Sequence, residues 1–212
     1  TAGGSVSAIE KGGNTLYIHH LAPERPRVEQ VETPHYFYTR LREKPLVKEG
    51  MLVVSAKTDG NPLVMANLLT STKGERPDVS TARGDGCVTG KAGSVPFAFS
   101  TRPGHIYTTG EYATDALAVT WDGSTTFAAL ATSLSRGGAL LVRSPVPVTC
   151  EITASGMKYY IGSTTKVSIG VSAPPKSVTV NGKPVTGVVY DAATKTVTLE
   201  LPEGEGEVRV RE

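Results

Sequence analysis

Glycine and proline divide this chain into segments that are too short for ordinary helices. The two residue types occupy 37 of the 212 positions, 23 as glycine and 14 as proline, and they are spread evenly along the sequence. No window of about a dozen residues keeps apolar side chains at helical spacing without a glycine or proline intervening. A fold built on long helices is therefore excluded.

The remaining composition favours strands. The chain has 24 Val, 26 Thr and 6 Ile, so about a quarter of its residues are β-branched. Such side chains fit a pleated, half-buried surface better than a helix. We therefore predict an all-β fold made of antiparallel β-sandwich units with no substantial helix.

Four short turn sequences predict hairpins. Lys11–Asn14, Asp122-Gly123, Gly137-Gly138 and Asn181-Gly182 each separate two segments with alternating apolar and polar side chains. Asn-Gly and Asp-Gly pairs accept the positive φ angles that tight hairpins require. The second and third turns together predict a three-stranded meander.

A domain boundary is predicted at Ser144–Pro147. Two prolines one residue apart remove two hydrogen-bond donors and stiffen the backbone, which suits a joint. We therefore predict a larger β-sandwich domain at 1–145 and a small C-terminal β-sandwich module at 146–212. Before this boundary, Thr72–Gly93 is rich in Gly, Arg, Lys and Asp and is interpreted as an irregular loop.

Charge and hydropathy restrict the partners. A net charge of +2 offers no polybasic surface for nucleic acid. Apolar runs such as Met51–Val54 are far shorter than the roughly 20 residues of a membrane span. The sequence opens with Thr1 and shows no signal-peptide pattern, so we expect a processed product or an excised piece.

The two cysteines leave two interpretations open. Cys87 and Cys150 are too far apart in sequence for a Cys-x-x-Cys site. In an exported protein they can form one disulfide. Alternatively, Cys150 is a buried apolar strand residue and Cys87 lies in a glycine-rich loop.

The histidines do not predict a metal site. His19 and His20 are adjacent on an expected strand, so their side chains point to opposite faces. No spacing selects His35 or His105 as a further ligand. Hydrogen-bonded or surface histidines are the default interpretation, and we predict neither a metal nor a cofactor.

Known motifs of nucleophilic or phosphate chemistry are missing from the sequence. We therefore assign no catalytic residue. The tripeptide Arg83-Gly84-Asp85 is one that integrin ligands display on loops, but it also arises by chance in chains of this length.

The sequence offers one candidate glycan-binding surface. Tyr36 and Tyr38 alternate along an expected strand, and Arg40 continues the same face. Aromatic rings can stack on sugars, and a guanidinium can fork onto a uronate carboxylate. The alternative is that these tyrosines belong to the core, because the chain has only 13 aromatic residues to fill it.

Several stretches, taken together, resemble the C-terminal β-sandwich region of heparinase II/III-like polysaccharide lyases. The matching pattern covers most of the chain, in the segments Leu52–Leu69, Asp115–Thr132, Gly138–Arg143, Val148–Ile152, Val178–Val185, Tyr190-Asp191 and Leu201–Gly204. In these lyases an α-helical toroid precedes the sandwich and supplies most catalytic residues, and this chain contains no toroid. The family's Gly-His-x-Asp segment is also altered, since Gly104–Tyr107 has Tyr in place of Asp.

The resemblance implies a non-catalytic C-terminal β region of an exported polysaccharide-degrading enzyme, secreted or periplasmic. Its partners would be the catalytic domain of the same polypeptide and an acidic polysaccharide. A free-standing carbohydrate-binding or adhesin-type β-sandwich protein is the alternative. A complete small β enzyme is a third reading.

Overall fold

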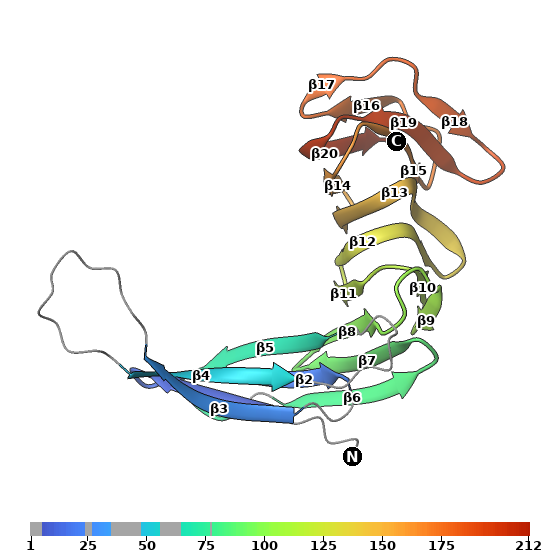
Figure 1. Cartoon of the computed structure of the whole chain (residues 1–212). Coiled ribbons are helices and arrows are strands. Elements are labelled where there is room, and N and C mark those ends of the chain that lie inside the picture. Colours follow the sequence, from blue (N-terminus) through green and yellow to red (C-terminus); the bar gives the residue numbers. More distant parts are fainter. Residues whose placement is uncertain (1–5, 24–26, 35–47, 56–64, 77) are drawn as a thin grey trace, which may run out of the picture. The chain divides into compact units, whose positions relative to one another are not determined.

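The computed structural model describes residues 6–23, 27–34, 48–55, 65–76 and 78–212 (Figure 1). All regular elements in these ranges are β-strands, and their pairings are antiparallel. The predicted all-β, sandwich-like fold class is confirmed. Within the same ranges, no helix has the length and apolar character needed to cross a membrane.

The chain divides into two compact units between Lys73 and Gly74. Unit 1 contains two small sheets. One has the order β1-β2-β5 and the other is the hairpin β3-β4. The strands of unit 1 are β1 (Val6–Lys11), β2 (Asn14–Ala22), β3 (Arg27–Pro34), β4 (Lys48–Ser55) and β5 (Ala66–Thr72).

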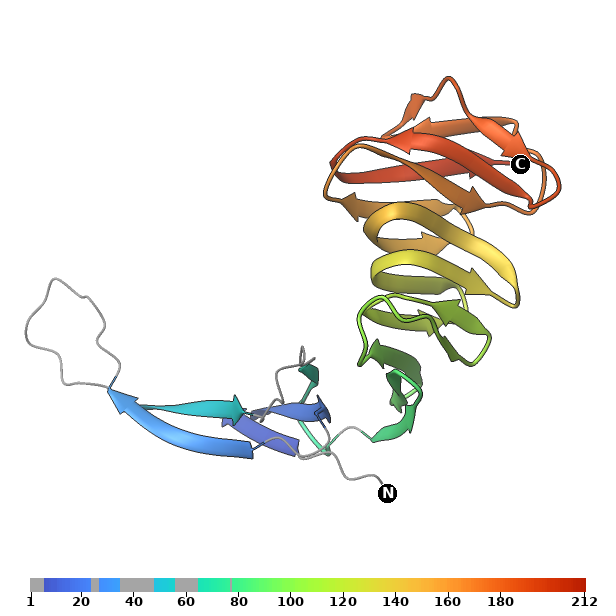
Figure 2. The ribbon, with the colours of Figure 1, turned by 45° about the vertical axis from the view of Figure 1, so that its right-hand side comes forward.

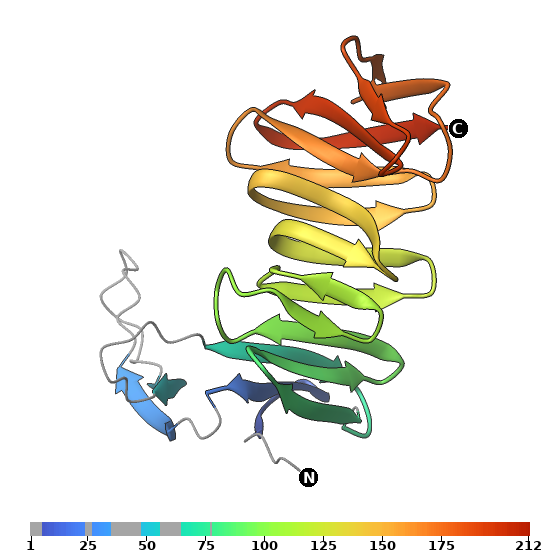
Figure 3. The ribbon, with the colours of Figure 1, turned by 90° about the vertical axis from the view of Figure 1, so that its right-hand side faces the viewer.

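Unit 2 contains fifteen strands joined in one hydrogen-bonded network. Figure 3 shows these strands stacked along the unit, in colours that run from green to red. The strands are β6 (Val79–Gly84), β7 (Cys87–Ala92), β8 (Val95–Ser100), β9 (Tyr107–Thr109), β10 (Tyr112–Thr114), β11 (Ala118–Asp122), β12 (Thr125–Arg136), β13 (Ala139–Thr153), β14 (Gly156–Ile161), β15 (Thr165–Gly170), β16 (Ser177–Val180), β17 (Lys183–Pro184), β18 (Val189–Asp191), β19 (Thr196–Leu201) and β20 (Gly204–Arg211).

Two long strands, β12 and β13, each belong to both layers of unit 2, and Figure 2 shows them curling between the layers. The first half of β12 pairs with β11 and its second half with β10. The first half of β13 pairs with β15 and its second half with β14. The first layer therefore runs β17-β16-β20-β14-β13-β12-β11-β8-β7-β6, and the second runs β9-β10-β12-β13-β15-β19-β18.

The two prolines at the predicted boundary lie inside β13, and the two compact units divide between Lys73 and Gly74. Arg143 pairs with Ser133 of β12, and the next paired residue of β13 is Val148. The prolines thus occupy the interval where β13 leaves one layer for the other and its pairing with β12 is interrupted. Missing N–H donors are tolerated there, so the Ser144–Pro147 joint connects layers of one unit.

Side chains from both layers meet in one core. The first layer contributes Ala98, Val119, Ala128 and Cys150 among others, and the second contributes buried residues such as Leu134. Strand alternation produces this arrangement. In β14, for example, Met157, Tyr159 and Ile161 are buried while the side chains between them are exposed.

The four predicted hairpins are confirmed. They connect β1 to β2, β11 to β12, β12 to β13, and β16 to β17. At the last turn, Asn181 and Gly182 both have positive φ angles, 52° and 75°, as the tightest two-residue hairpins require.

The predicted irregular loop at Thr72–Gly93 is wrong for most of its length, because it contains the hairpin β6–β7. Strand β6 is an edge strand, and its outward side chains are exposed. Charged residues are common on such edges because they discourage pairing with other chains. Only one residue of β6, Arg83, is charged. The other charges that suggested a loop lie before β6, in the β6–β7 turn and at Lys91 of β7.

Candidate functional site

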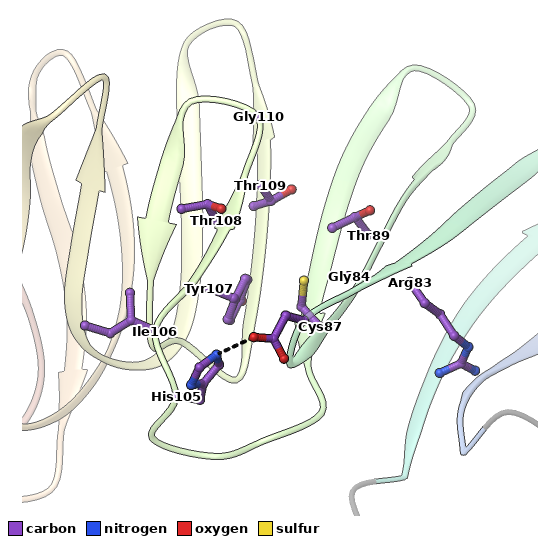
Figure 4. A pocket seen from close by; sticks show the side chains of 11 residues that line it. Arg83, Gly84, Cys87, Thr89, His105, Ile106, Tyr107, Thr108, Thr109 and Gly110 are labelled. Atoms are coloured by element: carbon purple, nitrogen blue, oxygen red, sulfur yellow. Dashed lines mark ion pairs between the residues drawn. The ribbon is translucent and has the colours of Figure 1, made fainter.

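The candidate site is an open cavity of about 450 Å³ within unit 2, between β7 and the edge strand β9. We call it the β7–β9 pocket (Figure 4). Its lining comes from the β6–β7 turn, from β7, and from the segment that leads into β9. The lining residues are Arg83, Gly84, Asp85, Cys87, Thr89, His105, Ile106, Tyr107, Thr108, Thr109 and Gly110.

Charged groups gather at the β6–β7 turn. The Asp85 carboxylate accepts a hydrogen bond from the Arg102 guanidinium, with Nη1 and Oδ1 3.1 Å apart. Its other oxygen lies 3.8 Å from Nε2 of His105, the contact drawn in Figure 4. All three side chains are exposed, so the cluster offers polar contacts to solvent and adds little stability.

Gly86 fixes the place of His105. The residue has φ +72°, and a Cβ atom there would lie 2.5 Å from Cδ2 of the imidazole. The ring therefore packs directly against the turn backbone, which only glycine permits. The carbonyl of Gly86 also accepts a hydrogen bond from the Thr101 amide at 2.8 Å, which ties this turn to the β8–β9 segment.

Cys87 and Tyr107 lie at the buried side of the pocket, and both are held neutral. Burial raises the pKa of the Cys87 thiol, and the charge of Asp85 acts in the same direction against a lowering contribution from the Gly84 backbone. Burial likewise raises the pKa of Tyr107, whose hydroxyl donates to the Ala116 carbonyl at 2.9 Å. Neither group is an activated nucleophile or base at neutral pH.

Threonine side chains provide the rest of the polar wall. Thr89 comes from β7, and Thr108 and Thr109 come from β9, as Figure 4 shows. Hydroxyl groups can both donate and accept hydrogen bonds. The pocket therefore combines a guanidinium, an imidazole, a carboxylate and hydroxyls, which is a set suited to binding a polar ligand.

The predicted glycan-binding residues Tyr36, Tyr38 and Arg40 lie outside the described residues, and so does His35. Of the other singled-out positions, the structure brings Arg83-Gly84-Asp85 and His105 together at the pocket. Sequence reasoning considered them separately and missed Arg102. No signal in the sequence links Arg102 to this cluster, because it lies 17 positions from Asp85 and in a different turn.

The histidines of β2 are hydrogen-bonded strand residues, which agrees with the interpretation made from the sequence. In His20, Nδ1 donates to the Asn67 side-chain oxygen at 2.8 Å, and the Ser7 hydroxyl is 3.0 Å from Nε2. His19 is buried, with Nε2 3.0 Å from the Thr70 hydroxyl. Across the described ranges, no group of three or more His, Cys, Asp or Glu side chains could hold a metal ion.

Both cysteines are free and buried, so the disulfide interpretation is not supported. Cys150 is a buried strand residue of β13, as the alternative proposed. Cys87 differs from that alternative, because it begins strand β7.

We expect the free energy of unfolding to fall as the pH rises above about 9, partly because of Cys150. Burial raises the pKa of this thiol to about 12, whereas an unfolded thiol ionises near 9. Between these values only the unfolded state loses the proton, so one thiol lowers stability by up to about 1.4 kcal/mol per pH unit. Below the unfolded pKa its contribution is constant.

Urea unfolding from pH 7 into this alkaline range, with the parent and a Cys150→Ala variant, measures the effect. The variant should show a shallower decline of the free energy of unfolding. Equal slopes for the two proteins would contradict the assigned pKa.

No protein-family model matches the chain, and no curated protein gives a significant match. The likeness to heparinase II/III-like lyases therefore stays a prediction from sequence.

Proposed function

We propose that this chain is a non-catalytic β region of an exported polysaccharide-degrading enzyme, which supports the catalytic domain and contacts acidic glycan at the β7–β9 pocket. The observation that carries the proposal is the composition of the pocket. Asp85 and His105 line an open cavity that is walled by threonine hydroxyls, and Arg102 lies beside it through its ion pair with Asp85. The thiol and the phenol at the buried side of the cavity are kept neutral.

Acidic sugars fit this chemistry for two reasons. The Arg102 guanidinium has five N–H donors, and its hydrogen bond to Asp85 uses Nη1. The remaining N–H groups of this guanidinium can therefore donate hydrogen bonds to a uronate carboxylate. Sugar hydroxyls match the hydroxyls of Thr89 and Thr108, which line the cavity.

The binding test is a titration of the ¹⁵N-labelled chain with heparin and alginate tetrasaccharides, followed by amide chemical shifts. We expect shifts at Asp85, Gly86 and His105, and weaker binding as salt is added. Arg102→Ala should weaken binding about tenfold. Arg143→Ala, which removes an exposed arginine of β13, is the matched control and should bind like the parent.

Two results would count against the proposal. Acidic oligosaccharides that leave the pocket amides unshifted would remove the glycan contact. A rise in unsaturated-uronate absorbance when the purified chain is incubated with heparin, alginate or hyaluronan would remove the non-catalytic assignment.

A second candidate is a free-standing carbohydrate-binding or adhesin-type protein, which the position of Arg83-Gly84-Asp85 favours. The tripeptide is exposed at the β6–β7 turn, where integrin ligands carry it. The ion pair between Arg102 and Asp85 counts against this candidate, because it engages the carboxylate that such a ligand presents. Cell attachment to the immobilised chain that is lost in Asp85→Ala but kept in Arg102→Ala would favour it.

A further inference from the structure

Three large apolar side chains are exposed on the outer face of the first layer, two on β12 and one on β14. Phe127 is 39% exposed, Leu130 51% and Tyr160 60%. Strand register places Phe127 in one row with Glu151 and Lys158. Thr149 and Tyr160 form the next row, opposite Leu130. We call these six residues the Tyr160 face.

A β-bulge presents Leu130 on this face. Between the pairs Ala128–Cys150 and Ala131–Val148, β12 has two residues where β13 has only Thr149. Leu130 takes φ +54°, a left-handed conformation that non-glycine residues rarely adopt. Its amide donates to the Thr149 hydroxyl at 3.2 Å, which holds the bulge.

The strain at Leu130 is not explained by core packing. Ala128 and Ala131 on either side of the bulge are fully buried, while the Leu130 side chain is mostly in solvent. Glycine or asparagine would take this conformation more readily. An apolar side chain kept exposed in an unfavourable backbone conformation indicates a contact outside this unit.

The polar groups between these apolar side chains are balanced in charge. Nζ of Lys158 lies 3.3 Å from Oε1 of Glu151, and the two exposed side chains neutralise each other. On the neighbouring strand, Glu205 pairs with Tyr160 and Glu207 pairs with Lys158. Glu207 is itself ion-paired with Arg209, whose Nε lies 3.0 Å from its Oε1. Around Tyr160 both cations are therefore already paired with carboxylates, and Glu205 adds one more carboxylate, which disfavours an acidic ligand.

We propose that the Tyr160 face binds a chain of an uncharged polysaccharide. The C–H face of a sugar stacks on the Tyr160 ring, and its hydroxyls bond the Glu151–Lys158 pair and the Thr149 hydroxyl. Phe127 and Leu130 extend the contact across β12, two strand spacings or about 10 Å from β14. This site is separate from the β7–β9 pocket and differs from it in preferring neutral glycan.

The size of the surface argues against a protein partner. Stable protein interfaces involve about 20–30 residues on each side with a contiguous apolar centre. Here, three apolar side chains are separated by a threonine and an ion pair. Such a surface fits a narrow, weakly held chain of alternating C–H faces and hydroxyls.

The test uses cellohexaose, laminarihexaose and mannohexaose as probes, each titrated into the ¹⁵N-labelled chain at millimolar concentration. We expect at least one probe to shift the amides of Thr149, Glu151 and Tyr160. Tyr160→Ala should weaken that binding about tenfold without lowering the melting temperature, because the ring is exposed. Tyr160→Phe should bind like the parent.

Two controls separate this site from other surfaces. Val189→Ala removes an equally exposed apolar side chain from β18 in the second layer and should leave binding unchanged. Arg102→Ala, which weakens the acidic-glycan contact proposed above, should also leave hexaose binding unchanged. Tyr160→Ala and Arg102→Ala therefore distinguish a failure of the Tyr160 face from a failure of the β7–β9 pocket.

Three results would overturn the proposal. The first is that none of the three hexaoses shifts the β12–β14 amides. The second is that Tyr160→Ala binds as well as the parent. The third is a concentration-dependent self-association, seen by analytical ultracentrifugation, that Tyr160→Ala abolishes, since this would assign the face to contact between copies.

Discussion

Gly170→Ala is expected to lower the free energy of unfolding by at least about 3 kcal/mol. Gly170 ends β15, and a Cβ atom there would lie 1.7 Å from the carbonyl oxygen of Leu140 in β13. Because the obstructing atom belongs to the backbone, no side-chain rotation can relieve the overlap. Relief requires β15 to move away from β13, which breaks the pairing at Val142–Ile169.

Gly162→Ala is the matched control for this substitution. A Cβ atom at Gly162 would meet nothing within 4 Å, and the residue has no left-handed φ. Its effect should stay within about 0.5 kcal/mol, as for ordinary surface changes. Urea unfolding of both variants measures the difference. A Gly170→Ala protein as stable as the Gly162→Ala protein would show that β13 and β15 do not approach as closely as described.

Local sequence patterns were sufficient to predict the turns and the fold class. Asn181-Gly182 selects a tight hairpin through the backbone preferences of the two residues themselves. At the other turn the Asp122 carboxylate accepts hydrogen bonds from the amides of Ser124 and Thr125, which is again a local preference of the residue. The alternation in Met157–Ile161 requires only that one face of a strand is buried. Such features depend on neighbours along the chain, so one sequence is enough to recognise them.

Features that depend on distant pairing were not predictable in the same way. Pro145 and Pro147 signal an interruption of a strand ladder, but a ladder can stop at a domain boundary or where a strand changes layers. Choosing between these outcomes requires knowledge of the strands that pair with β13 on both sides, which are β12 on one side and β14 and β15 on the other. The chain's division at Lys73–Gly74 has no comparable mark in the sequence.

The β7–β9 pocket was only partly visible in the sequence for the same reason. Asp85 and Arg102 are 17 positions apart, and neither belongs to a motif that implies the other. Gly86 explains why the turn at Asp85 lies close to the segment that carries Arg102 and His105. Its missing side chain lets the His105 ring pack on the turn. With 23 glycines in the chain, nothing in the sequence distinguishes this one.

Leu134→Ala is expected to lower the free energy of unfolding by about 2–5 kcal/mol, within the range for fully buried leucines. Leu134 lies in the second half of β12 and is 0% exposed in the core between the layers. It pairs with Thr114 on one side and Val142 on the other, so rigid strands surround the cavity that alanine would leave. Thermal and urea unfolding would measure the loss.

Leu130, four residues earlier on the same strand, provides the contrast. Its side chain is mostly exposed, so Leu130→Ala should cost less than about 1 kcal/mol. Leu130→Gly should even raise stability by up to about 1 kcal/mol, since glycine accepts φ +54° without strain. A large loss in either Leu130 variant would mean that this side chain supports the fold, and the strain argument for the Tyr160 face would then fail. If Leu130→Gly raises the free energy of unfolding while Leu134→Ala lowers it, then Leu134 stabilises the packing of the two layers. Leu130 would then contribute nothing to that packing, as expected of a residue that makes an external contact.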